Sequence, residues 1–322
     1  MMALHRPGRL LAILSAAALI CLAGQHADAT PQPAPAGGPI AEFAINDPNS
    51  IQTLGYVLWG KILGTVVDQD AKGNTSINYG GLGIQGRDAL NVFVNEMTEV
   101  PVKTLNKDEQ LAYWLNLYNA AWLRIMFDQF TGLGKSDQDL ASRNPWSESQ
   151  KFNVKRVYTA DDNPWTVRNL IVEGVALSLN DIEYRILYAH WKPELVVYGL
   201  SCPLRGCPAL GKQAFLGAQV QAQLRAAAQA FIADTDNVKV KGSSVQLSEL
   251  YQWNQVAFGG ASSVLEHVRQ NAGPRQAELQ AVTQVSGYDF DWKLAGKEPP
   301  KEIKSIQGQM NRGAGTGGYF QE

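Results

Sequence analysis

Apolar residues recur at helical spacing along the first third of the chain. Residues 51–67 and 86–97 each place large apolar side chains three or four positions apart, which predicts two helices. A third helix is expected to begin after Asn106, which can cap it while Glu109 reaches back toward the cap. The apolar pattern extends this helix to about Phe127.

Within this third helix, the stretch QLAYWLNLYNAAWL at 110–123 carries no charge and has large side chains on every side. A helix that is apolar all round is buried on most sides. Asn116 and Asn119 lie three positions apart on one face, and a buried amide without partners costs about 1–3 kcal/mol. We therefore expect both amides to be hydrogen-bonded to specific groups.

The second half of the chain alternates helices with short strands. Ser178 is expected to cap a helix that has Asp181 in its first turn. Residues 215–232 predict a helix with one apolar face, formed by Leu216, Val220, Leu224, Ala227 and Phe231. Further expected elements are strands at 76–79 and 194–200, a hairpin at 237–248, and helices at 249–259 and 261–270. Because helices dominate, we predict an α+β fold, a helix-rich single domain with short, mainly antiparallel strands.

The N-terminal residues 1–29 are typical of a secretory signal peptide, with basic residues, the apolar run LLAILSAAALICLAG, and small residues before the expected cleavage site. The run is shorter than the roughly 20 residues that span a bilayer. We therefore expect no transmembrane anchor after cleavage, and an exported protein that is periplasmic or extracellular. The expected organisation continues with a flexible Pro/Ala/Gly-rich leader at 30–48, one globular domain at 49–296 and a disordered tail at 297–322.

The net charge of -2 over 322 residues, with both signs interspersed, leaves no broad basic surface. We therefore expect no nucleic-acid partner. A small molecule or an envelope protein is the expected partner, and we predict no cofactor.

The segment YGLSCPLRGCPAL contains Cys202 and Cys207, the two cysteines that remain after signal cleavage. In an oxidising compartment they favour a disulfide. A reactive thiolate is the second interpretation, and it needs a nearby base or a positive environment. A zinc clip is the third, but zinc prefers four N or S ligands and the mature chain adds only His190 and His267, so we predict no metal site.

Four stretches, YWLNLYNA, LSLNDIEYRIL, LSCPLRGCPAL and YDFDWKL, occur together in this order. In these motifs the chain resembles the domain-of-unknown-function 547 family over roughly residues 49–296. The resemblance implies no established biochemistry. The family pattern usually places histidine after Asp-Ile-Glu and asparagine before the first cysteine, where this chain has Tyr184 and Ser201.

Two hypotheses of function follow. The first is a non-catalytic or degenerate exported domain that binds a ligand or an envelope partner, because the family's histidine is missing. The second is a thiol hydrolase or transferase that acts on peptide, amide or ester bonds, with Cys202 as nucleophile and Asn119 as an orienting amide. Tyr184 is a poor base, since an ordinary tyrosine pKa is about 10. The remaining candidates form an expected binding or structural polar cluster of Asn116, Asp181, Glu183, Tyr184 and Arg205.

Overall fold

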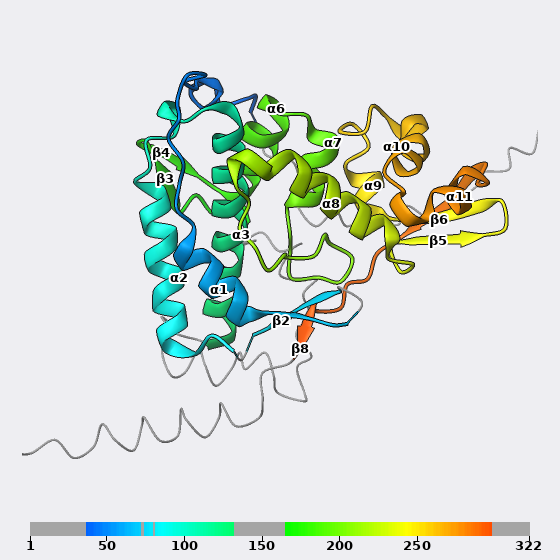
Figure 1. Cartoon of the computed structure of the whole chain (residues 1–322), viewed down its shortest axis with the longest axis horizontal. Helices are drawn as coiled ribbons and strands as arrows, with labels where there is room; N and C mark the ends of the chain where they lie inside the picture. The colour runs from blue at the N-terminus through cyan, green and yellow to red at the C-terminus, as the bar shows by residue number, and fades with distance from the viewer. Residues whose placement is uncertain (1–36, 72–73, 80, 132–164, 298–322) are drawn as a thin grey trace, which may run out of the picture.

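The computed structural model describes residues 37–71, 74–79, 81–131 and 165–297, in which helices and short strands alternate (Figure 1). The helices of five or more α-helical residues are α1 (Val57–Val66), α2 (Gly83–Thr98), α3 (Lys107–Thr131), α8 (Val220–Ala233), α9 (Glu249–Trp253), α10 (Val264–Gln270) and α11 (Gln276–Gln280). The other helical segments are η1 (Ala41–Ala44), η2 (Val102–Thr104), the π-helical η3 (Asp181–Leu187), α6 (Tyr188–His190), α7 (Pro193–Val196), η4 (Val197–Gly199), η5 (Gly217–Gln219), η6 (Ala261–Ser263) and η7 (Gly273–Arg275).

The described strands form three small sheets. Their strands are β1 (Val67–Gln69), β2 (Thr75–Asn78) and β8 (Gly296–Lys297) in the first sheet, β3 (Leu170–Val172) and β4 (Val175–Leu177) in the second, and β5 (Val238–Lys241), β6 (Ser244–Ser248) and β7 (Gln284–Asp289) in the third. The pairs β1–β2, β3–β4 and β5–β6 are antiparallel, whereas β2–β8 and β6–β7 are parallel. The protein is thus α+β, helix-rich with short, mostly antiparallel strands, as predicted.

Helix α3 lies at the centre of the larger hydrophobic core, beside α2 and with α1 close by (Figure 1). Its cap is as expected, because the Asn106 Oδ1 accepts the Glu109 N–H at 3.0 Å. The reciprocal bond is absent from the described contacts, and the expectation for Glu109 is corrected. Its carboxylate accepts the backbone N–H of Leu54 at 2.9 Å, since residues before α1 pass alongside the start of α3.

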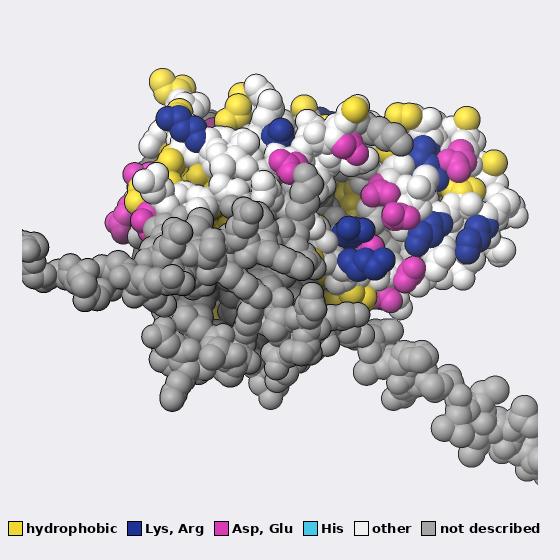
Figure 2. All heavy atoms as spheres, turned by 90° about the horizontal axis from the view of Figure 1, so that it is seen from below, with side chains coloured by type: hydrophobic (Ala, Val, Ile, Leu, Met, Phe, Trp, Pro, Cys, Tyr) yellow, Lys and Arg dark blue, Asp and Glu magenta, His cyan; other side chains and the backbone are white. Residues whose placement is uncertain are grey.

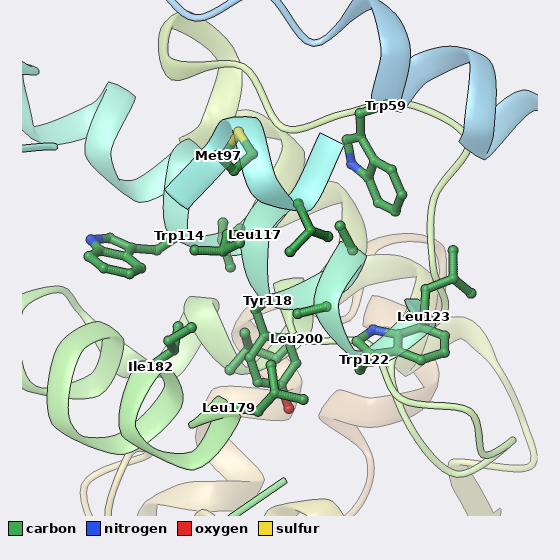
Figure 3. Close-up of a cluster of buried hydrophobic side chains, with 14 of the residues drawn as sticks. Trp59, Met97, Trp114, Leu117, Tyr118, Trp122, Leu123, Leu179, Ile182 and Leu200 are labelled. Atoms are coloured by element: carbon green, nitrogen blue, oxygen red, sulfur yellow. The ribbon is translucent and has the colours of Figure 1, made fainter. Parts of the chain in front are cut away.

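Aromatic and aliphatic side chains surround α3 on all sides, as its uncharged sequence predicts. Trp59 stacks on Phe93 with ring centroids 5.4 Å apart. Figure 3 shows Tyr118 of α3 directed toward Leu179 and Leu200, so that α3 meets the start of the η3 helix and the segment before the cysteine loop. A second, smaller cluster is formed by residues such as Tyr198, Phe231, Tyr251, Phe258 and Val268. Helix α8 contributes Leu224 to the first cluster and Phe231 to the second, and it therefore joins the two.

Several predicted elements are confirmed, including the strand at 76–79, the hairpin at 237–248 and the helix after Ser178. The strand expected at 194–200 is wrong, because this stretch forms α7 and η4. Pro193 and Glu194 lie in the first turn of α7, where proline and acidic residues favour a helix start. This preference overrides the β propensity of the valines that follow.

Helix boundaries also differ from the expectation. The first helix begins only at Val57, and the one expected at 249–259 ends at Trp253. In the 215–232 stretch, α8 is preceded by a 3₁₀ turn, so Leu216 lies outside the helix and is 38% exposed. Ala228 is buried in place of the expected Ala227.

The expected signal peptide and nearly all of the expected tail lie outside the described residues. Residues 37–48 of the expected leader are described, and Phe43 within them is buried with its ring 4.8 Å from that of Trp114. This part of the chain therefore packs on the main core. Within the described residues, no helix combines the length and the apolar character needed to cross a membrane.

Candidate functional site

Asn119 joins α3 to the segment that leads into the cysteine loop. Its amide Nδ2 donates to the carbonyl of Gly199 at 2.9 Å, and its Oδ1 accepts the backbone N–H of Ser201 at 3.0 Å. The same oxygen accepts the indole N–H of Trp122 at 3.2 Å. The residue is 2% exposed, and its amide therefore satisfies backbone groups of Gly199 and Ser201 that are buried in the core.

Asn116 repeats this arrangement one turn earlier. Its Nδ2 donates to the Phe215 carbonyl at 2.8 Å, and its Oδ1 accepts the Phe215 N–H at 3.0 Å and the Trp59 indole N–H at 3.2 Å. The two asparagines thus hold both ends of the segment from Gly199 to Phe215 against one face of α3. The expectation that both buried amides have specific partners is confirmed.

The cysteine loop is closed by a disulfide between Cys202 and Cys207, whose Cα atoms are 5.6 Å apart. Cys202 is 6% exposed, whereas Cys207 is partly exposed. The segment after β7 pairs with this loop. Arg205 N–H donates to the Lys293 carbonyl at 2.9 Å, and Ala295 N–H donates to the Pro203 carbonyl at 2.7 Å.

An aromatic cluster lies against the loop. Phe290 is 4.7 Å from Trp253 and 4.9 Å from Trp292, measured between ring centroids. A Cβ added to Gly206 would lie 2.5 Å from the Phe290 ring, so only glycine allows the loop to approach this closely. Phe290 is buried, and the two tryptophans are partly exposed.

Arg205 and Lys293 are neighbours across this backbone pairing, and both are exposed. Within the part of the chain that the structure describes, neither side chain forms an ion pair. Elsewhere charges of both signs are mixed, as the view from below shows to the right of the grey atoms (Figure 2). The loop and the segment paired with it therefore each present one exposed cation, and neither cation has a described acidic partner.

Asp181 fixes the start of the helix that follows Ser178. Its Oδ2 accepts the Ser178 N–H at 3.0 Å, while the Ser178 hydroxyl oxygen accepts the Asp181 N–H at 3.0 Å, a reciprocal cap. Arg168 and Arg185 bond the two carboxylate oxygens at 2.8 Å each. Burial opposes ionisation of this carboxyl, but these hydrogen bonds hold its pKa well below the ordinary value.

Glu183 is buried among tyrosines. Its two oxygens accept hydrogen bonds from Tyr188 at 3.1 Å and Tyr118 at 3.2 Å, and Tyr184 bonds to the same carboxyl. Burial raises the pKa of Glu183 to about 7, although these three hydrogen bonds oppose the shift. Burial also raises the pKa of Tyr184 well above 10, with the Glu183 charge acting in the same direction, so the Tyr184 hydroxyl stays protonated at neutral pH and cannot serve as a general base there.

The partners of Glu183 are the part of this region that pattern reading missed. Tyr188 lies five positions after Glu183, a spacing that an α-helix does not bring together but that the π-helical η3 does. Tyr118 precedes Asn119, so one turn of α3 contacts both the Glu183 carboxyl and the cysteine-loop segment. π-helical turns occur frequently at functional sites.

The two described histidines have other partners. His190 Nε2 lies 2.9 Å from the Ile40 carbonyl, and His267 Nε2 lies 2.9 Å from the Tyr198 hydroxyl in the second hydrophobic cluster. Burial lowers the pKa of His267 to about 4, so it is neutral at pH 7. Within the described residues, no group of three or more His, Cys, Asp or Glu side chains is arranged to hold a metal ion.

The expected candidates therefore fall into four groups. Asn116 and Asn119 hold the segment that contains the cysteines. Glu183 and Tyr184 adjoin that region through Tyr118, whereas Asp181 bonds Arg168 and Arg185 at the start of its helix. Arg205 is directed to solvent on the loop.

Comparison with known proteins adds a family but no activity. Residues 102–232 match the family described as "Protein of unknown function, DUF547". The match spans α3, η3 and the cysteine loop and ends within α8. Neither the curated proteins nor the solved structures contain a match to the chain.

Proposed function

We propose, for a chain whose residues 102–232 form a DUF547 domain, that the protein is an exported binding domain without catalytic activity. We place its ligand on the face formed by the cysteine loop and the segment 290–295. The ligand class that fits this face is an anionic molecule with a ring, such as a sugar that carries a carboxylate.

The observation that carries the binding function is the pair of exposed cations, Arg205 and Lys293, beside partly exposed Trp253 and Trp292. Guanidinium groups bind carboxylates with two parallel hydrogen bonds, and a lysine adds a second positive charge. Tryptophan rings offer a large flat apolar surface with little conformational freedom to lose on binding. Together these groups favour a ligand that has both a ring face and a negative charge.

The absence of catalysis is supported by how the thiol candidates are engaged. Cys202 shares a disulfide, and Asn119 uses its oxygen and one amide hydrogen in three bonds, two to the loop segment and one to Trp122 of the same helix. The described hydrogen bonds of His190 and His267 go to Ile40 and Tyr198. A thiol enzyme requires a free nucleophile with an oriented base.

Two disaccharides that differ in one lactyl group, which carries a carboxylate, test the proposal. Calorimetric titration compares N-acetylglucosaminyl-N-acetylmuramic acid with the uncharged dimer of N-acetylglucosamine. We expect the acidic disaccharide to bind at least about tenfold more tightly, which corresponds to about 1.4 kcal/mol. The Arg205→Ala/Lys293→Ala variant should lose this preference, and Arg225→Ala, which removes an exposed cation from α8, should keep it.

Equal binding of the two disaccharides, or no binding of either, would contradict the proposed ligand. Mass spectrometry of the incubated acidic disaccharide and of a peptide-bearing derivative tests the catalytic hypothesis in parallel. Product that forms with the wild type, under reducing conditions, and not with Cys202→Ser would replace the binding function with thiol hydrolysis.

A further inference from the structure

We infer that Cys202 and Cys207 form a reversible dithiol–disulfide site that exchanges with small thiols while the protein stays folded. This redox function goes beyond ligand binding and does not depend on it. Three features of the cysteine loop carry it: its anchoring, the unequal exposure of the two sulfurs, and the adjacent cation.

The loop is anchored by bonds that do not involve sulfur. On one side, Asn119 holds the backbone of Gly199 and Ser201. On the other side, the backbone N–H groups of Arg205 and Gly206 donate to the carbonyls of Lys293 and Asp291 at 2.9 and 3.0 Å. The Pro203 carbonyl accepts from Ala295, and Leu204 forms an isolated antiparallel bridge with Leu294.

Reduction removes none of these bonds. The Cα atoms of the two cysteines are 5.6 Å apart, within the roughly 4.4–6.8 Å range that a disulfide needs. Because these bonds hold the backbone on both sides of Cys202 and directly before Cys207, the reduced sulfurs remain within reach of each other. The folded protein therefore accommodates the dithiol and the disulfide with the same backbone.

The two sulfurs differ in access. Cys202 is 6% exposed and belongs to the main core, whereas Cys207 is partly exposed and packs at the edge of that core. An incoming thiolate reaches Cys207 first. Arg205 lies in the same loop, is exposed, and forms no ion pair with any described residue, so its charge favours the approach of the anion.

The exchange proceeds in two balanced steps. The substrate thiolate attacks the Cys207 Sγ, which forms a mixed disulfide, and the S–S bond breaks to release the Cys202 thiolate, which takes up a proton. A second substrate thiolate attacks the substrate sulfur of the mixed disulfide and releases the Cys207 thiolate. Two thiols are thereby oxidised to one disulfide, and the protein disulfide is reduced by two electrons. Buried Gly206 and Pro208 flank Cys207, which favours a slender, low-molecular-weight thiol as the substrate.

Equilibration of the mature protein in glutathione redox buffers tests the site. Maleimide labelling with intact-mass measurement gives the fraction reduced, and circular dichroism and tryptophan fluorescence report the fold in the same samples. We expect the protein to convert fully between the dithiol and the disulfide as the ratio of reduced to oxidised glutathione is varied. Circular dichroism and tryptophan fluorescence should each change by less than about 10%. Reduction that requires denaturant, or loss of native signal in step with reduction, would overturn the inference.

Single substitutions test the direction of attack. Cys202→Ser leaves Cys207 as the only thiol of the described residues, and Cys207→Ser leaves buried Cys202. Oxidised glutathione should modify Cys207 in the first variant at least tenfold faster than Cys202 in the second. Equal rates would refute the assigned entry point. The wild-type equilibration does not depend on the folding of either variant, and it does not test ligand binding, so failure of one proposal is distinguishable from failure of the other.

Discussion

Replacing Asn119 by leucine should destabilise the protein strongly, because the amide is a structural partner of three buried groups. The variant keeps a side chain of similar size but leaves the Gly199 carbonyl, the Ser201 N–H and the Trp122 indole N–H without a partner. Each orphaned buried group costs about 1–3 kcal/mol, so the free energy of unfolding should fall by at least about 3 kcal/mol. That is a large share of the about 5–15 kcal/mol typical of a folded domain.

Urea unfolding followed by tryptophan fluorescence and circular dichroism measures this loss. With a slope of about 1–3 kcal/mol per molar urea, the midpoint should fall by about 1 M or more. Asn95→Leu is the matched control, since Asn95 is an exposed residue of α2, and its effect should stay within about 0.5 kcal/mol. Asn116→Leu should resemble Asn119→Leu, because it also orphans three groups.

A loss below about 1 kcal/mol for Asn119→Leu would refute this reasoning. Such a result would mean that the loop segment finds other partners or that water reaches it. It would also mean that Asn119 is not required for folding, so Asn119 would again be a candidate orienting amide of a thiol enzyme.

Three further predictions concern the acid, the disulfide and the loop glycine. The folded pKa of Glu183 is raised to about 7 from an ordinary 4.5, so its stabilising proton is fully held below about pH 4.5 and is lost as the pH rises through 7. Relative to Glu183→Gln, wild-type stability measured by urea unfolding at pH 5, 6, 7 and 8 should therefore decline by up to about 3 kcal/mol, and a constant difference would contradict the shifted pKa. The Cys202→Ser/Cys207→Ser variant should lose only about 2 kcal/mol of unfolding free energy, because the disulfide closes a short loop. A loss above about 4 kcal/mol would show that the folded state depends on the disulfide. Gly206→Ala should lower the melting temperature, because the added Cβ clashes with the Phe290 ring at a cost of about 1–3 kcal/mol. Gly64→Ala is the control and should be neutral or slightly stabilising, because its added Cβ meets nothing within 4 Å. Equal effects of the two substitutions would argue against close packing of the loop.

The fold class and most elements could be predicted from local pattern. The uncharged α3 stretch predicts burial on all sides, and Asn106 and Ser178 mark helix starts whose cap bonds are present. Local pattern failed at residues 194–200, where valines favour a strand but Pro193 begins a short helix. There the side chains are divided between two hydrophobic clusters, which periodicity within one segment does not reveal.

The candidate region shows the same limit. The need for partners at Asn116 and Asn119 follows from polarity inside an apolar helix. The identity of those partners does not, because Gly199 and Phe215 are 80 and 99 positions away in sequence. The environment of Glu183 depends on π-helical geometry, which brings Tyr188 to the carboxyl and has no simple sequence period of its own.

The pairing of the cysteine loop with residues 291–295 sets the order in which the chain can complete its fold. Synthesis proceeds from the N-terminus, so the loop exists for more than 80 residues of elongation before its partner emerges. During that interval the backbone groups of Pro203, Arg205 and Gly206 lack their native partners. A chain that stops before residue 291 would retain the DUF547 segment yet leave the loop unsupported on one side. The cysteine loop therefore reaches its native backbone pairing only after residues 291–295 have been synthesised.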